Sequence, residues 1–112
     1  AARSWSLKNA SGITPDPRVV ADKKWWADYQ SIETRNPGTY SVAGYSAMDV
    51  IAAGVRQANS FDAGRVANAL RSLELQTLVG KVQFDSSGDL EEQKVYIFQV
   101  TSGDFAQVWP AR

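Results

Sequence analysis

Residues 80–100 read "GKVQFDSSGDLEEQKVYIFQV" and mark the point at which the sequence changes from a helical to an extended pattern. From Gly80 onward the apolar residues Val82 and Phe84 alternate with polar ones, which is the period of two expected of a strand. The run 94–100 is rich in β-branched and aromatic residues, and "TSGD" separates it from "FAQVW". This spacing predicts a strand followed by a C-terminal β-hairpin.

The acidic centre of this stretch admits three interpretations: a calcium loop, a pair of catalytic carboxylates, or a turn between extended segments. A helix-loop-helix calcium site requires acids at alternating positions before a glycine and a glutamate at the twelfth position, and Ser86 and Ser87 interrupt that spacing. Acid–base catalysis by two carboxyl groups requires a cleft whose surroundings give the two groups different pKa values. A Ser- and Gly-rich turn between strands offers no such cleft. The sequence therefore favours a turn in which Asp85 accepts hydrogen bonds from downstream N–H groups and Gly88 takes positive φ.

Helices are predicted before this stretch. Asp16 and Pro17 supply an acidic cap and a proline at the first helical position, and they predict a helix that runs to about Glu33. We expect the apolar positions at helical spacing to be buried, namely Ala21, Trp25, Tyr29 and Ile32. The adjacent Trp25 and Trp26 could stack on a sugar or an aromatic ligand, but we interpret them as part of the core and its partly exposed rim.

The clearest helical pattern follows the breaker "NPG" at residues 36–38 and extends to Ala58. We expect its apolar stripe to be buried; the stripe consists of Val42, Tyr45, Met48, Ile51, Ala52, Val55 and Ala58. Small residues such as Gly44 and Gly54 leave little side-chain bulk on this helix. Another element could therefore approach it closely.

A third helix is predicted from Asp62, as the N-cap, to about Leu73. Phe61 is placed to pack against Val66 as a hydrophobic staple. Val66, Leu70 and Leu73 would form its inner stripe. Because only a short turn separates the second and third helices, we expect them to form an antiparallel pair.

Composition excludes several classes of function. The 112 residues are 44% hydrophobic and carry 12 basic and 12 acidic side chains, which gives no reason to expect a nucleic-acid partner. The absence of cysteine and histidine excludes disulfides and thiolate sites and removes the commonest general base and metal ligand. No nucleophile elbow or phosphate loop is present, so we expect neither an enzyme nor a bound metal or cofactor.

Three segments carry a further pattern: "PGTYSVAGYSAMDVI" (37–51), "ANALRSLELQTLVGKVQFDSSGDL" (67–90) and "VYIFQVTSGDFAQVWP" (95–110). In this order they resemble the C-terminal third of type I periplasmic binding proteins of the branched-chain amino-acid group. The matching residues are Pro37, Tyr40, Gly44, Tyr45, Ala47, Ala69, Leu70, Gly80, Phe84, Asp85, Gly88, Asp89, Gly103 and Phe105. Ser46 departs from the pattern, because an acidic residue is common there. The resemblance covers about residues 13–110.

The resemblance implies an α/β fold: the C-terminal portion of a two-lobed, Rossmann-like receptor that is longer than this chain. The last crossing between the lobes would fall near residues 93–95. Residues 1–93 would then complete the first lobe, and residues 94–112 would form the crossover strand and hairpin of the second. Such a hairpin would join a sheet covered by helices from elsewhere in the receptor.

The resemblance also implies a function. In this family an aromatic or apolar side chain just before the "GY" helix reaches the cleft between the lobes, and Tyr40 occupies that place, with Ser41 beside it. The partners would be a small solute such as an amino acid or another aromatic or aliphatic carboxylate, an ABC transporter permease, and the rest of the receptor or a second copy of this chain. The location would be periplasmic, or extracellular and membrane-associated.

Two alternative functions remain open from the sequence alone. The same fold could be the ligand-sensing domain of a signalling or regulatory protein. The chain could instead be a self-contained α+β module whose exposed aromatic faces bind a protein. A stable, compact monomer would favour this last interpretation.

Overall fold

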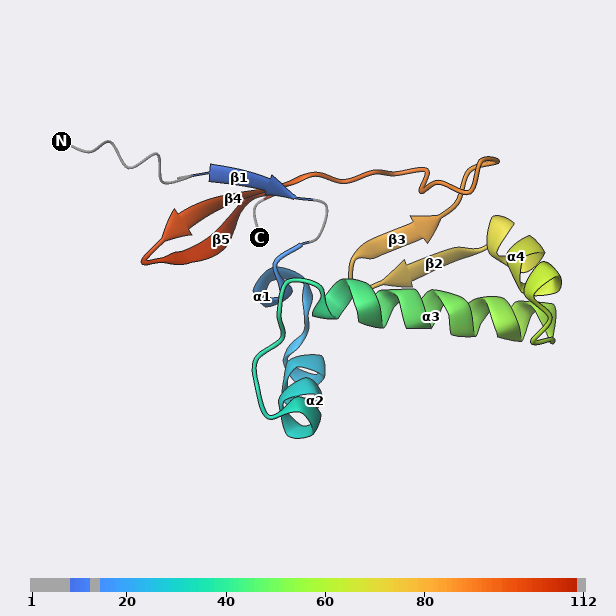
Figure 1. The fold of residues 1–112 in the computed structure, drawn as a ribbon, viewed down its shortest axis with the longest axis horizontal. Coiled ribbons are helices and arrows are strands. Elements are labelled where there is room, and N and C mark those ends of the chain that lie inside the picture. Colours follow the sequence, from blue (N-terminus) through green and yellow to red (C-terminus); the bar gives the residue numbers. More distant parts are fainter. Residues whose placement is uncertain (1–8, 13–14, 111–112) are drawn as a thin grey trace.

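The computed structural model describes residues 9–12 and 15–110, and its helices precede most of its strands (Figure 1). The elements are β1 (Asn9–Gly12), α1 (Pro17–Val20), α2 (Lys23–Glu33), α3 (Ser41–Ala58), α4 (Ala63–Arg71), β2 (Glu74–Thr77), β3 (Gly80–Gln83), β4 (Tyr96–Thr101) and β5 (Asp104–Trp109). The predicted arrangement of helices, a strand and a C-terminal hairpin is confirmed.

The predicted single helix from Pro17 to Glu33 is wrong, because two aspartates each start a helix of their own. The carboxylate of Asp16 accepts a hydrogen bond from the backbone N–H of Arg18 at 2.9 Å, and that of Asp22 accepts one from the N–H of Trp25 at 2.7 Å. The prediction of a buried face on this helix is also wrong. No residue of α2 is fully buried, and Ile32 is 78% exposed.

The second and third predicted helices are confirmed as α3 and α4. Asp62 caps α4 by accepting a hydrogen bond from the N–H of Arg65 at 3.0 Å. α4 lies beside the C-terminal half of α3, where a Cβ on Gly54 would come within 2.7 Å of Leu70 Cδ2. Close packing at Gly54 is therefore confirmed. The predicted staple is wrong, since Phe61 is 92% exposed.

The face of α3 that this chain buries overlaps the predicted stripe only at Val42, while Ala52, Val55 and Ala58 of that stripe are half-buried. The buried residues are spaced four apart and comprise Val42, Ser46, Val50 and Gly54. Tyr45, Met48 and Ile51, which belong to the predicted inner stripe, are exposed on the opposite side. The prediction failed because α3 is apolar on both sides, and amphipathicity does not tell which side the chain itself covers.

A two-stranded antiparallel sheet, β2–β3, covers part of the buried face of α3. Its register pairs Leu75 with Val82, and the buried core of this part consists of Val50, Leu73 and Val82. Strand β2 was not predicted. Its four residues directly follow the end of α4 and are too few to display a clear alternation.

The acidic turn after β3 is confirmed. Oδ1 of Asp85 accepts hydrogen bonds from the N–H groups of Ser87 at 2.8 Å and Asp89 at 3.0 Å. The N–H of Asp85 donates to the carbonyl of Asp89 at 2.8 Å, and Gly88 has φ of +89°. The carboxylate of Asp85 thus serves the backbone of its own turn.

The second sheet contains three antiparallel strands in the order β1-β4-β5. The predicted hairpin is formed by β4 and β5, and its turn residues Ser102 and Gly103 both have positive φ, as a tight two-residue turn requires. Most large apolar side chains of this hairpin remain partly exposed, including Ile97, Phe105, Val108 and Trp109.

The chain leaves much apolar surface open. Its accessible surface is 8206 Å², roughly a third more than the ~6100 Å² expected of a compact monomer of this mass. Figure 1 shows that α2 and the β4–β5 hairpin extend away from α3 in different directions. The uncovered apolar surfaces include the outer side of α3 and the hairpin.

Candidate ligand-binding site

Tyr40 lies directly before the first turn of α3. Its side chain is 75% exposed and makes no capping hydrogen bond to the helix. Its carbonyl accepts the N–H of Gly44 at 2.9 Å, so its backbone is part of the first helical turn. The structure therefore presents an open aromatic ring beside the N-terminus of an 18-residue helix, where the helix dipole favours an anionic group.

Ser41 lies half-buried behind Tyr40. Its Oγ accepts a hydrogen bond from the N–H of Gly38 at 2.9 Å and donates one to the hydroxyl of Tyr29 at 3.1 Å. The hydroxyl therefore joins the segment before α3 to helix α2. The role of Tyr40 and Ser41 in ligand binding stays a prediction.

The two tryptophans at the start of α2 have different surroundings. Trp25 packs between Tyr29 and Tyr45, with ring centroids 5.4 and 5.5 Å away, and so joins α2 to α3. Trp26 lies between two clefts. Both tryptophans are half-buried, so they form a rim, and neither belongs to the buried core as the sequence had suggested.

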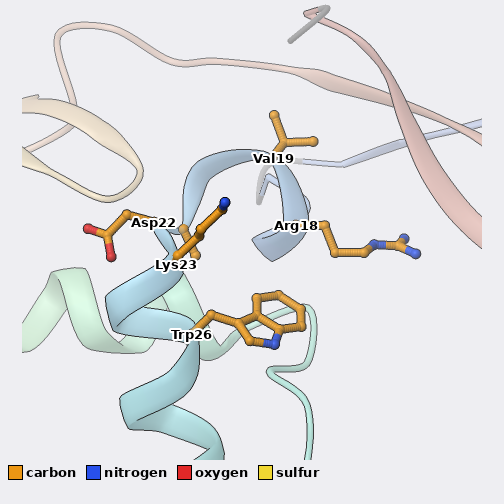
Figure 2. A pocket seen from close by; sticks show the side chains of 6 residues that line it. Arg18, Val19, Asp22, Lys23 and Trp26 are labelled. Carbon is orange, nitrogen blue, oxygen red and sulfur yellow. The ribbon is translucent and has the colours of Figure 1, made fainter.

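The smaller cleft next to Trp26 has a volume of about 280 Å³ and lies between α1, the 36–39 segment and the β4–β5 hairpin. Phe98, Asp104 and Phe105 line it from the hairpin. The larger cleft, about 750 Å³, is wide open and is shown in Figure 2, where Trp26 extends from α2 beneath Arg18 of α1. Thr39, the residue before Tyr40, lines the smaller cleft.

An ion-pair network joins α1 to the hairpin across the smaller cleft. Arg18 pairs with the buried carboxylate of Asp16 at 2.7 Å and with Asp104 at 3.2 Å, and it also donates to the carbonyl of Phe105. The N–H of Asp16 donates to the side chain of Gln107 at 2.9 Å. Burial would raise the pKa of the Asp16 carboxyl, but the hydrogen bonds from Arg18 and its positive charge outweigh burial, so this pKa lies below its ordinary value.

Sequence reasoning did not predict this network or the cleft beside it. Asp16 had a recognisable role as a helix cap, but nothing in the sequence indicated that Arg18 would reach a residue 86 positions away. The same holds for Trp26, which faces hairpin residues from the far end of the chain. Within the described parts of the chain, no group of three acidic residues has the geometry of a metal site.

Comparisons with known proteins place this geometry in a family. The periplasmic binding protein family matches residues 7–104. A Leu/Ile/Val-binding protein, BraC3, of Rhizobium johnstonii is 32% identical over 105 residues. That match covers 92% of this chain but only 28% of the relative, so the chain spans less than a third of the relative's length.

Solved structures have the same fold. An ABC transporter substrate-binding protein from Desulfitobacterium hafniense in complex with Leu superposes with a TM-score of 0.72 at 21% identity, over 89% of this chain and 30% of that one. A solute-binding protein from R. palustris in complex with benzoate superposes with a TM-score of 0.70 at 14% identity, over 89% of this chain and 28% of that one. From the family match and the shared fold together, the chain belongs to the periplasmic binding protein family.

Proposed function

We propose that this chain is part of a solute-binding receptor that captures a small organic molecule, an amino acid or a related carboxylate, for uptake by an ABC transporter. The observation that carries the proposal is family membership combined with the open ring of Tyr40 at the start of α3. The names of the relatives support the ligand class, since one is a Leu/Ile/Val-binding protein and two were crystallised with leucine and benzoate. Family and relatives are binding proteins, and no catalytic step is proposed.

The proposed contact residues are Tyr40 and Ser41. The exposed ring of Tyr40 offers an apolar surface for an aliphatic or aromatic side chain. The adjoining N-terminus of α3 suits a carboxylate, because its N–H groups and dipole attract negative charge. Ser41 has a lone pair left beside its two hydrogen bonds and can accept from an ammonium or hydroxyl group.

The proposed mechanism is closure of two lobes on the solute. We assign the helices and the β2–β3 sheet, within residues 1–93, to the first lobe and residues 94–112 to the second. Strand β1 pairs with β4, so we place β1 with the sheet of the second lobe. The contacts of Arg18 with Asp104 and Phe105 then join the two lobes. A solute that contacts both lobes would shift the equilibrium toward the closed form by its greater affinity for that form.

The uncovered surfaces are consistent with a larger receptor. The outer side of α3 and the β4–β5 hairpin expose large apolar side chains, and contiguous exposed patches of this kind mark surfaces that contact other protein. We propose that the rest of the receptor covers them. Membership of this family suggests a periplasmic or extracellular location and a transporter permease as the partner.

The test is isothermal titration calorimetry on the receptor that contains this chain, with leucine, isoleucine, valine and benzoate as probes. We expect at least one of them to bind. Tyr40→Ala should weaken that binding at least about fivefold, because the ring loses its apolar contact, whereas Tyr40→Phe should retain most of it. Absence of binding by all four probes, or equal affinity of the Tyr40→Ala variant, would contradict the proposal.

A further inference from the structure

We propose that Tyr29, on helix α2, is a positioning residue for the ligand contact at Tyr40. It acts through the hydroxyl of Ser41, which ties the segment carrying Tyr40 to α2. The inference rests on the proposed function, since it concerns the residue that would contact the solute. It adds a residue from another helix, eleven positions before Tyr40, to the determinants of the site.

The segment that carries Tyr40 is closed by two reciprocal hydrogen bonds. The N–H of Gly38 donates to Oγ of Ser41 at 2.9 Å, and the N–H of Ser41 donates to the carbonyl of Gly38 at 3.1 Å. Thr39 and Tyr40 lie at the outside of this loop. Because the side chain of Tyr40 makes no capping bond of its own, the direction of its ring depends on the backbone that these two bonds hold.

The hydroxyl of Ser41 holds two partners at once. One of its two lone pairs receives the N–H of Gly38 at 2.9 Å, and the hydroxyl of Tyr29 lies at 3.1 Å, where a hydrogen bond in either direction leaves that lone pair in place. The bond to Tyr29 therefore holds Oγ in the position that accepts from Gly38. Without it, the side chain of Ser41 is free to turn toward solvent or another backbone group.

Tyr29 is itself held in place by aromatic packing. Its ring lies 5.4 Å from that of Trp25, and Trp25 meets Tyr45 of α3 edge-to-face at 5.5 Å. These rings fix the distance between α2 and the first turns of α3. A change in how α2 sits on α3 would move the hydroxyl of Tyr29 and, through Ser41, the ring of Tyr40.

The test compares two substitutions that each remove one hydroxyl from this aromatic cluster. Tyr29→Phe removes the hydroxyl that bonds Ser41 and keeps the ring. Tyr45→Phe is the matched control. The hydroxyl of Tyr45 makes no hydrogen bond to the described residues, and the substitution keeps the packing of its ring against Trp25. Both variants are made in the receptor that contains this chain.

The first readout is amide hydrogen exchange at Gly38 in the ligand-free receptor, measured by NMR. We expect exchange to accelerate about threefold to tenfold in Tyr29→Phe and to stay unchanged in Tyr45→Phe. Equal exchange in the two variants would overturn the inference. This readout needs no ligand, so it separates failure of the positioning role from failure of the proposed function, which would appear as a lack of binding by the unmodified receptor.

The second readout is the affinity for leucine. Tyr29→Phe should weaken it about threefold to tenfold, with a loss of stability no larger than the roughly 1 kcal/mol of one hydrogen bond, and it should have no further effect in a Ser41→Ala background, because the two residues act through one hydrogen bond. Ser41→Thr, which keeps a hydroxyl, should restore most of the affinity lost in Ser41→Ala. Independent, multiplying effects of the Tyr29 and Ser41 substitutions would contradict the inference.

Discussion

The two sides of helix α3 differ in what covers them. On one side Val42, Ser46, Val50 and Gly54 are buried beneath other elements of the same chain. On the opposite side Tyr45, Met48 and Ile51 are exposed, and Met48 retains 63% of its accessible surface. Both sides are apolar enough to belong to a core, yet the chain supplies a partner for only one of them.

This difference teaches that apolar character and local cover are separate properties of a helix face. On the covered side α4 comes close to α3 at Gly54, where Leu70 leaves no room for a larger side chain. The uncovered side carries larger side chains, which bury more area when a partner is present. In our proposal that partner is the rest of the receptor. The match with BraC3 covers only 28% of that relative, so most of a receptor of that length would lie outside this chain.

The largest expected effect comes from placing the same charge on each side of α3. Val50→Asp and Met48→Asp should each destabilise the receptor by about 3 to 5 kcal/mol, because an unpaired carboxylate would be buried in both cases. Arg56→Asp, at an exposed position of α3 that already carries a charge, is the control and should cost about 1 kcal/mol. Urea unfolding measures all three. A cost for Met48→Asp no larger than for Arg56→Asp would show that the outer side is open.

An intermediate effect is expected where α4 meets the covered side. Gly54→Ala should cost about 1 to 2 kcal/mol, because the added methyl would lie 2.7 Å from Leu70 Cδ2 and 3.0 Å from Cγ, and this outweighs the higher helix propensity of alanine. In a Leu70→Ala background the same substitution should cost nothing or stabilise. Urea unfolding of the unmodified receptor, the two single variants and the double variant gives the coupling. Equal costs in both backgrounds would mean that the close contact is absent.

The smallest effect concerns two serines of α3. Oγ of Ser46 is buried and has no hydrogen-bond partner among the described residues, so Ser46→Ala should leave stability unchanged or raise it by about 1 kcal/mol. Ser41→Ala removes a bonded hydroxyl and should lower stability by about 1 kcal/mol. Thermal unfolding compares the two. A loss in Ser46→Ala as large as in Ser41→Ala would indicate a partner for Ser46.

Features with local causes could be predicted from the sequence. The start of α4 at Asp62, the turn held by Asp85 and the hairpin turn at Ser102 and Gly103 each depend on a few adjacent residues. The break between α1 and α2 also had a local cause, in the second capping aspartate, Asp22, but the helical spacing of apolar residues across it concealed the signal.

Features that depend on packing could not be predicted. Which side of α3 would be covered depends on where α4 and the β2–β3 sheet lie, and the covered side includes a polar residue, Ser46. For the candidate site, the resemblance to a family predicted Tyr40 and Ser41, and their role in binding stays a prediction. The bond between Ser41 and Tyr29 and the contact between Arg18 and Asp104 arise only when separate elements meet, and no spacing in the chain encodes them.

The most direct measurement is thiol labelling of single cysteines in the native receptor, since this chain contributes no cysteine of its own and any others can be replaced. Met48→Cys and Val50→Cys report the two sides of α3, and Arg56→Cys reports an exposed, charged position of the same helix. The account predicts that both Met48→Cys and Val50→Cys label at least about a hundredfold more slowly than in urea, while Arg56→Cys does not. Fast labelling of Met48→Cys together with protection of Val50→Cys would contradict it.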